Sequence, residues 1–512
     1  MKTLKHALRA TLLGLLYTLP LAGLQSFVFW TVHQSIPQTF LAFCLWFVAL
    51  APIPGLRVLS SFPGIPVAHG LGLPKVPDVR ELSRYLTIGI GVLGLLGAVV
   101  LFWKDSWLLH LIAALTAMLL TLVLGVRILI GLRSIPFRKS ELKATIAKLA
   151  PDAIIYTGRS DGGDYQIRQW LSIIQAVLPN TLIVTRDSSA ADALAAALPA
   201  NTPIVTCREN ADLDMAMHSG AQIVFYVNSV GSNSTMVNYR SLHHVYLGHG
   251  DSDKEISAHP VHRMYDSIFV SGRAAIDRYA TANVQLDHGQ AVLVGRPQLA
   301  ELIPAHGSGS IKTMLYAPTW SGYNLASSLS SLDRAEPFIQ DCLDRGLRII
   351  FRPHPFSLNR GSDARHVALI DALLQKSSSK NVGSRQASTQ SLYELFNQSD
   401  ALATDISSIV VDYLPTHKPI AILTENDDVA EYRRLFPTSA SAYLASSPAS
   451  PGWQQMFGSD AMSAKREELA EYYVSDATAK SFDLAIEAIL ARLASKSCQQ
   501  ESRALPDGRS RA

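Results

Sequence analysis

A histidine with a glycine on each side is the residue of this sequence best suited to acid–base chemistry. His249 lies between Gly248 and Gly250 and directly follows the apolar run at residues 244–247, which is typical of a buried strand. Small neighbours leave the imidazole sterically open, and histidine titrates near neutral pH, so this side chain suits a base that takes a proton from a bound hydroxyl. The alternative is a loop histidine that only hydrogen-bonds a nearby carbonyl.

The same loop contains two carboxylates that invite a metal-binding interpretation. Asp251 and Asp253 are two positions apart, and four further histidines are close in the sequence: His243, His244, His259 and His262. Metal ligands must converge on one point, and this spacing matches no such arrangement. We therefore predict no metal site and no cofactor.

A second histidine is held between two prolines. The segment Arg352 to Pro355 reads RPHP and follows a predicted strand at residues 347–351. The prolines fix the backbone around His354, and the guanidinium of Arg352 suits phosphate oxygens. Because ligands bind beyond the carboxyl ends of parallel strands, a ligand explains this pair better than packing does.

Two further polar turns follow predicted strands. The segment from Thr404 to Ser408 reads TDISS; either it only caps the next helix, or its hydroxyls and amides cradle a diphosphate, and the spacing favours neither. The segment from Gly158 to Asp164 reads GRSDGGD, a glycine-rich turn whose amides could approach an acceptor or a phosphate, although such turns are common between strands and helices.

The elements that must position these residues alternate between strand and helix patterns. The predicted strands are residues 153–156, 181–185, 203–206, 223–227, 244–247, 267–270, 292–294, 313–316, 347–351, 401–404 and 419–423. Repeated strand–helix order predicts parallel sheets with helices on both faces. We expect an α/β, GT-B-like pair of doubly wound domains at residues 143–303 and 311–494, a linker at 304–310 and a disordered tail at 495–512.

The chain begins with apolar stretches of membrane-spanning length. Residues 10–30, 85–103 and 107–126 each predict a transmembrane helix; the first is too long for the apolar region of a cleavable signal peptide, which is its alternative. Residues 40–56 predict a further span that Pro52 and Pro54 shorten, either a tilted helix or a re-entrant arm. Basic residues gather before the first stretch, between the stretches at 40–56 and 85–103, and after the last stretch: Lys2, Lys5, Arg9, Arg57, Lys75, Arg80, Arg84, Arg127, Arg133, Arg138 and Lys139. Residues 1–135 are thus expected to anchor the chain in a bacterial-type inner (plasma) membrane as a multi-pass segment, with the soluble domains cytoplasmic.

Charge and cysteine usage exclude some partners. The chain of 512 residues has 45 basic and 42 acidic residues, too balanced for a nucleic-acid coat. Its four cysteines are scattered, which favours a reducing compartment for the soluble part.

Six motifs in one order resemble the CDP-glycerol glycerophosphotransferase family, the teichoic-acid primases and polymerases. They are His249-Gly250 followed by Lys254, DSIFVSG ending at Gly272, VGRP ending at Pro297, LYAPTW ending at Trp320, RPHP ending at Pro355 and ATDISSIVVD ending at Asp412. The match covers about residues 242–423. It implies a GT-B fold, a CDP-activated polyol phosphate donor bound mainly by the C-terminal domain, and a membrane-associated acceptor.

The resemblance also implies roles for single residues. His249 matches the family's proposed base and His354 the histidine at the donor's pyrophosphate. The donor-binding residues are expected to be Arg296, Thr319, Trp320, Arg352, Thr404, Asp405, Ser407, Ser408 and Asp412. The acceptor-binding residues are expected to be Gly158, Asp161, Gly162, Gly163 and Lys254. The chain departs from the family at Asp251-Ser-Asp253, where Thr-Pro-Leu is common, and at Ser321, where a basic residue is common.

The leading hypothesis is a membrane-anchored enzyme that moves glycerol phosphate, or a related polyol phosphate, from a CDP donor to a hydroxyl of a lipid-linked glycan and releases CMP. A GT-B nucleotide-sugar glycosyltransferase is an alternative, although Glu425 and Glu431 are six positions apart rather than the eight seen in many retaining enzymes. A non-catalytic scaffold of a surface-polymer assembly complex is a third hypothesis.

Overall fold

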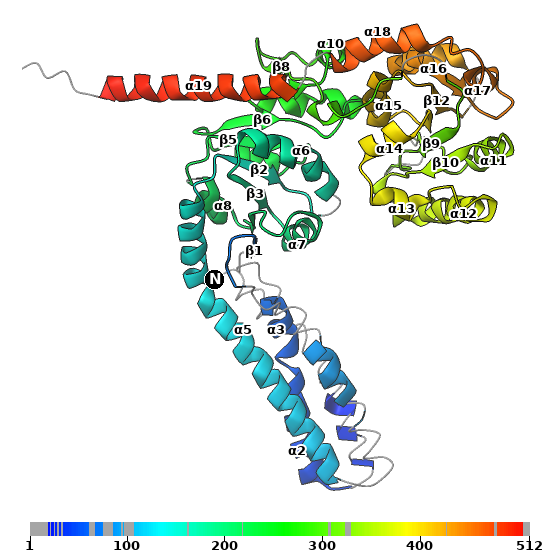
Figure 1. Ribbon diagram of the computed structural model, residues 1–512. Coiled ribbons are helices and arrows are strands. Elements are labelled where there is room, and N and C mark those ends of the chain that lie inside the picture. The colour runs from blue at the N-terminus through cyan, green and yellow to red at the C-terminus, as the bar shows by residue number, and fades with distance from the viewer. Residues whose placement is uncertain are drawn as a thin grey trace, which may run out of the picture. The chain divides into compact units, whose positions relative to one another are not determined.

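The computed structural model describes most of the chain. The described residues are 19–20, 22–24, 26–27, 30–31, 34–60, 67–74, 85–93, 96, 107–160, 163–217, 219–305, 309–322, 329–425, 428–475 and 479–504. They divide into two compact units (Figure 1). The first contains residues 1–149, 186–195 and 199–216; the second contains the remainder.

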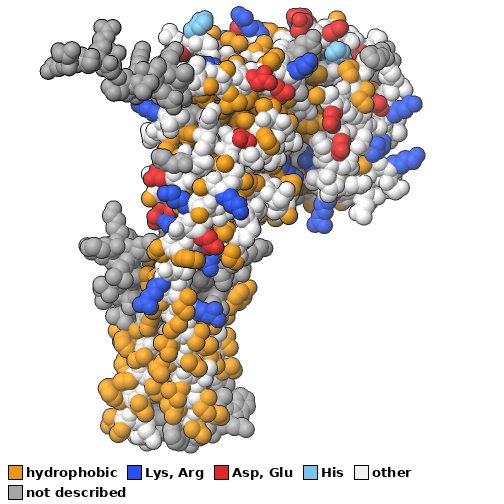
Figure 2. All heavy atoms as spheres, turned by 60° about the vertical axis from the view of Figure 1, so that its left-hand side comes forward, with side chains coloured by type: hydrophobic (Ala, Val, Ile, Leu, Met, Phe, Trp, Pro, Cys, Tyr) orange, Lys and Arg blue, Asp and Glu red, His pale blue; other side chains and the backbone are white. Residues whose placement is uncertain are grey.

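Long apolar helices dominate the first unit. Its described helices include α2 (Ile36–Leu50), α3 (Ile53–Ser60) and α5 (Trp107–Leu149). Two segments of the described chain, Ile36–Leu59 and Leu108–Leu149, are long and apolar enough to cross a membrane. Their outward side chains include Phe40, Leu119 and Leu122, and Figure 2 shows hydrophobic side chains over the surface of these helices. Most of the predicted span at residues 10–30 and part of that at 85–103 lie outside the described residues.

Helix α5 continues beyond residue 135, the predicted end of the membrane segment. The helix runs without interruption from Trp107 to Leu149, with Pro136 inside it. The C-terminal half of this helix is amphipathic. Leu142 and Ile146, one helical turn apart, are buried, whereas Lys139 forms an ion pair with Asp212 at 2.5 Å. The same unit contains helix α8 (Asn210–Met217), strand β4 (Ile204–Thr206) and strand β1 (Ala68–His69); β1 pairs with β4 antiparallel and was not predicted from the sequence.

A parallel sheet forms the first domain of the second unit. Its strands are β2 (Ala153–Thr157), β3 (Thr181–Thr185), β5 (Ile223–Tyr226), β6 (His243–Tyr246), β7 (Ser267–Val270) and β8 (Ala291–Leu293). They lie in the order β3-β2-β5-β6-β7-β8, and each predicted strand in this region is present. The helices of this domain are α6 (Asp164–Val177), α9 (Asn233–Val237) and α10 (Arg273–Thr281), while α7 (Ser188–Ala197) belongs mostly to the first unit.

A second parallel sheet forms the other domain. Strands β9 (Thr313–Ala317), β10 (Arg348–Phe351), β11 (Ala401–Thr404), β12 (Ile420–Leu423) and β13 (Tyr443–Ala445) lie in the order β10-β9-β11-β12-β13. Strand β13 was not predicted from the sequence. The helices are α11 (Glu336–Asp344), α12 (Gly361–Ser377), α13 (Ser384–Ser388), α14 (Leu392–Gln398), α15 (Ser408–Tyr413), α16 (Val429–Leu435), α17 (Pro451–Met456) and α18 (Ser463–Val474). Apolar residues of the strands are buried on both faces, as expected for parallel sheets.

The last helix packs on the first domain and corrects the boundary predicted at residue 494. Helix α19 (Ala479–Ala504) follows α18, yet its Phe482 ring contacts Trp170 and Phe225 of the first domain, at centroid distances of 5.8 and 6.4 Å. Phe482, Ile486 and Ile489 form a buried stripe at helical spacing. The helix continues through Ala504, so residues 495–504 are not the disordered tail that was predicted; residues 505–512 lie outside the described chain.

Candidate active site

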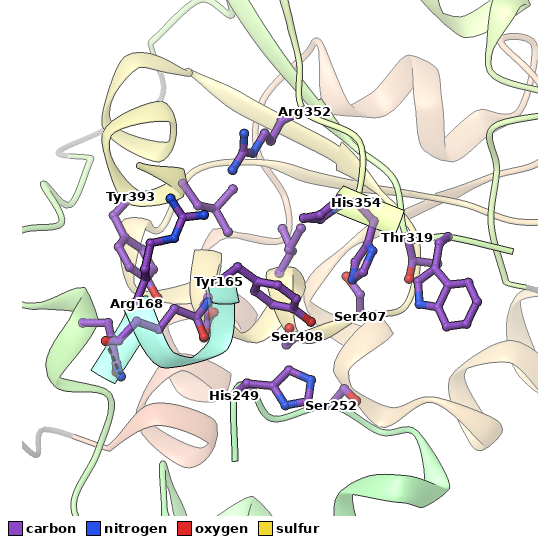
Figure 3. Close-up of a pocket in the computed structure, with 18 of the residues that line it drawn as sticks. Tyr165, Arg168, His249, Ser252, Thr319, Arg352, His354, Tyr393, Ser407 and Ser408 are labelled. Atoms are coloured by element: carbon purple, nitrogen blue, oxygen red, sulfur yellow. Dashed lines mark hydrogen bonds between the residues drawn. The ribbon is translucent and has the colours of Figure 1, made fainter. Parts of the chain in front are cut away.

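One large cavity lies where loops from both sheets meet. Its volume is about 1330 Å³, and loops that follow β5, β6, β9, β10 and β11 contribute to its wall (Figure 3). His249 comes from the first domain, whereas His354 and Ser407 come from the second. The carboxyl ends of the two sheets therefore supply one shared site, as open parallel sheets do.

His249 has one ring nitrogen fixed by the backbone. Its Nδ1 is 3.2 Å from the carbonyl oxygen of Val227, which follows β5. A carbonyl only accepts a hydrogen bond, so Nδ1 carries the proton and Nε2 carries the lone pair. Burial lowers the pKa of His249 to about 4, against a weaker opposing effect of the Val227 carbonyl. The imidazole is thus neutral at physiological pH, which is the form a general base requires.

His354 has the opposite tautomer. It is the N-cap residue of the 3-10 helix η5 (Pro355–Leu358), and its Nδ1 accepts the backbone N–H of Phe356 at 3.1 Å. Because Nδ1 accepts, the proton of the neutral ring lies on Nε2. Burial, together with the nearby His249 and Lys254, lowers the pKa of His354 to about 3. His354 therefore presents a neutral N–H donor rather than an imidazolium.

A tyrosine that the sequence analysis missed lies between the two histidines. The Tyr165 ring meets the rings of His249 and His354 edge-on, with centroids 6.1 and 5.9 Å away (Figure 3). Gln166 donates to its hydroxyl at 3.1 Å. Tyr165 is in the first turn of α6, directly after the glycine-rich turn, and that position was the available signal.

The TDISS segment divides into supporting and cavity-lining residues. Thr404 and Asp405 are fully buried and do not line the cavity: Thr404 Oγ1 donates to the Ala317 carbonyl, and Asp405 accepts the backbone N–H of Thr319 at 2.8 Å. Burial raises the pKa of Asp405 to about 6. Ser407 and Ser408 do line the cavity, and the Ser407 Oγ is buried without a hydrogen-bond partner in the described part of the chain.

Arg296 and Asp412 bind each other. Arg296 Nε and Nη2 donate to the two carboxylate oxygens of Asp412 at 3.0 and 2.9 Å, and both side chains are buried. Asp412 also lines the cavity, whereas Arg296 does not. The predicted donor-binding pair is thus an ion pair between the two domains that supports the cavity wall.

Basic side chains are distributed along the cavity wall. Lys254 and Arg352 were predicted to bind substrates and do line it; Arg159 and Arg168 line it as well and were missed. Lys254 Nζ is 3.4 Å from Thr319 Oγ1, and Arg352 Nη1 donates to the Ala387 carbonyl. The predicted Thr319 and Trp320 also line the cavity, and the guanidinium of Arg360 lies 4.8 Å from the Trp320 ring centroid.

The glycine-rich turn contributes differently than predicted. Gly158 and Gly163 are not cavity-lining, and a Cβ on Gly158 would lie 1.7 Å from Ser232 Oγ, so this glycine permits close packing. Arg159, between them, reaches the cavity. Asp161 and Gly162 lie outside the described residues.

The two carboxylates after His249 are occupied by protein groups. Asp251 contacts Arg278 and accepts a hydrogen bond from Ser271, while Asp253 accepts hydrogen bonds from Thr438. Among the described residues, no group of three or more His, Cys, Asp or Glu side chains is arranged to hold a metal ion.

Comparisons with known proteins place part of the chain in a family. Residues 254–449 match the model of the family described as CDP-Glycerol:Poly(glycerophosphate) glycerophosphotransferase, so the resemblance expected from the motifs is confirmed. The matched segment includes Arg352, His354 and Ser407 and begins five residues after His249. Comparison with curated proteins gives no match.

Several solved structures are distantly similar. The wall teichoic acid polymerase TagF is 14% identical, with 72% of this chain and 97% of that chain covered and a TM-score of 0.46. S. aureus MnaA with UDP is 11% identical, with 64% and 93% covered and a TM-score of 0.40. Anabaena Alr3699/HepE in complex with UDP is 10% identical, with 67% and 100% covered and a TM-score of 0.40. The family match, carried by residues 254–449, supports a CDP-glycerol glycerophosphotransferase-like enzyme.

Proposed function

We propose that the protein is a membrane-anchored GT-B transferase that moves glycerol phosphate, or a related polyol phosphate, from a CDP-activated donor to a hydroxyl of a lipid-linked glycan. The family match supports the class of reaction. The opposite tautomers of His249 and His354, on the two walls of one cavity, carry the proposal. The reaction needs a base beside the acceptor hydroxyl and a hydrogen-bond donor beside the phosphates of the CDP donor.

His249 is the base in this proposal. An acceptor hydroxyl bound beside it attacks the β-phosphorus of the donor, its proton passes to Nε2, and a new P–O bond forms. The bond from that phosphorus to the bridging oxygen breaks, and CMP leaves. General-base catalysis of this kind contributes about 10²–10⁴-fold in rate. The Nδ1 proton stays with the Val227 carbonyl, which holds the ring in the productive tautomer.

His354 and its neighbours act on the donor. The Nε2–H of His354 and the buried Ser407 hydroxyl can donate to phosphate oxygens, and neither brings a charge of its own. Arg159, Arg168, Lys254 and Arg352 supply positive charge on the cavity wall. Donors fixed in place before the reaction stabilise the charge that develops on the leaving CMP.

The apolar segments of the first unit support the proposed anchoring. The helical segments Ile36–Leu59 and Leu108–Leu149 can each cross a bilayer by length and composition. Arg127 and Arg133 are exposed beyond the most apolar part of α5, and basic residues at a span end favour the cytoplasmic side. The proposed location is therefore a bacterial-type plasma membrane, with the transferase domains facing the cytoplasm.

A donor panel tests this function. The full chain in detergent, titrated by calorimetry with CDP-glycerol, CDP-ribitol and a UDP-sugar, is expected to bind a CDP-polyol most tightly and to release CMP from it when membrane lipid is added. Preference for the UDP-sugar would instead indicate a glycosyltransferase. Donor binding without CMP release under any acceptor would indicate a non-catalytic scaffold.

A further inference from the structure

The loop that carries His249 is attached to the opposite domain at three points. A Cβ on Gly250 would lie 2.5 Å from the Cβ of Ser408, so the Gly250 backbone lies directly against the Ser408 side chain. Asp253 accepts hydrogen bonds from Thr438, and Lys254 reaches Thr319 Oγ1 at 3.4 Å. The base therefore belongs to the first domain by sequence but is held against the second domain by contact.

Asp253 makes most of this attachment. One carboxylate oxygen accepts the backbone N–H and the hydroxyl of Thr438 at 2.7 and 2.5 Å. The other accepts the Tyr473 hydroxyl at 3.1 Å and lies 3.5 Å from the guanidinium of Arg278. The Asp253 side chain is only 4% exposed, and Thr438 and Tyr473 are buried. The carboxylate thus has partners at both oxygens and from two separate segments of the second domain.

Asp251 holds the same loop to its own domain. It accepts a hydrogen bond from Ser271 and contacts Arg278, so Arg278 lies against both aspartates. Asp251 and Asp253 are also the positions at which this sequence departs from the resembling family, where Thr-Pro-Leu is common. Leucine, which stands at the position of Asp253 in that pattern, has no side chain that can accept these hydrogen bonds, so the attachment through Asp253 depends on a residue that departs from the pattern.

We propose that Asp253 is a positioning residue, which fixes the distance between His249 and the donor bound by the second domain. The inference rests on the proposed function, because it assigns Asp253 a role in that reaction. Attack on phosphorus requires the base and the donor to be placed within a fraction of an ångström, and a displacement of about 1 Å can cost about 10²-fold in rate. Asp253 also lines the cavity, but its two carboxylate oxygens accept hydrogen bonds from Thr438 and Tyr473, so its proposed action is through His249.

Two adjacent tyrosines provide a matched test. Tyr473 donates to Asp253, and Tyr472 donates to the exposed Asp277 of α10 at 2.8 Å. Both contacts join the two domains, but only the first involves the loop of His249. Tyr473→Phe and Thr438→Val are expected to lower kcat about tenfold or more while the Kd for CDP-glycerol changes less than about twofold. Tyr472→Phe is expected to leave both within about twofold.

Hydrogen exchange separates this inference from the proposed function. Amide exchange of residues 249–254 is expected to rise in Tyr473→Phe and Asp253→Asn and to stay at the wild-type rate in Tyr472→Phe, whether or not CDP-glycerol is turned over. Equal exchange in all variants would overturn the attachment. Faster exchange with an unchanged kcat would overturn the positioning role. Absence of CMP release from the wild type would contradict the proposed function. The comparison of amide exchange would still show whether Asp253 attaches the loop of His249 to the second domain.

Discussion

Arg296 and Asp412, 116 positions apart, form a buried bidentate ion pair that joins the two domains beside the cavity. Neither partner could be placed from its local sequence, and both were expected to touch the donor. In the structure both carboxylate oxygens of Asp412 accept from Arg296, and Arg296 does not line the cavity.

This pair predicts a large loss of stability in single variants. Asp412→Asn or Arg296→Met leaves one buried charge without its partner, which costs about 3–5 kcal/mol. Chemical denaturation of the full chain measures this change. The double variant Arg296→Met/Asp412→Leu is expected to recover most of the loss, since no buried charge remains unpaired. Single variants as stable as the wild type would show that the pair is not formed.

Gly250→Ala is expected to displace the loop of His249. The added Cβ would lie 2.5 Å from the Ser408 Cβ, closer than real contacts, so one of the two segments must move. We expect kcat to fall about tenfold or more, since the base moves relative to the donor. Gly231→Ala is the control because a Cβ there meets no atom within 4 Å. An unchanged kcat in Gly250→Ala would contradict the close approach.

The lowered pKa of His354 predicts that acid destabilises the fold. Its pKa falls from 6.5 to about 3 in the folded protein, so between these values the unfolded chain binds the proton and the folded chain does not. The contribution of this group to stability is therefore fully present above about pH 6.5 and is lost as the pH falls towards 3. Melting temperatures measured at pH 7 and pH 5 should differ less in His354→Asn than in the wild type. The change in melting temperature between pH 7 and pH 5 would count against the burial of this ring if it were the same in His354→Asn as in the wild type. A larger change in His354→Asn than in the exposed control His288→Asn would also count against it.

Helix α19 offers a packing prediction. Phe482 is fully buried against Trp170 and Phe225, so Phe482→Ala is expected to cost about 3–5 kcal/mol of unfolding free energy. Leu484 lies on the same helix and is 61% exposed, and Leu484→Ala should change stability by less than about 0.5 kcal/mol. Equal effects of the two substitutions would mean that α19 does not pack on the first domain.

The strands and the two histidine loops were predictable because their signals are local. A buried parallel strand is a short apolar run, and the loop after it carries the polar residues, so His249, His354, Ser407 and Lys254 were all placed in advance on loops that reach the cavity. Strand β13 (Tyr443–Ala445) was missed because serine and alanine surround it on both sides, so no run of large apolar residues marks it.

The remaining features depend on contacts between distant segments. Tyr165 carries no motif, and its position between two histidines results from how α6 meets loops of both domains. Asp253 lies 185 positions from Thr438 and 220 positions from Tyr473, its hydrogen-bond partners. The packing of α19 on the first domain likewise joins distant segments, since Phe482 contacts Trp170. The sequence pattern predicts which face of a helix is apolar but not which domain covers it.

The most direct measurement is the rate of CMP release from CDP-glycerol, with membrane lipid present, in His249→Ala and in the control His288→Ala. His288 is exposed and does not line the cavity, so its variant should release CMP at the wild-type rate. We expect His249→Ala to release CMP about 10²–10⁴-fold more slowly, because the acceptor hydroxyl loses its base. Release by His249→Ala at the wild-type rate would contradict the assignment of His249 as the base.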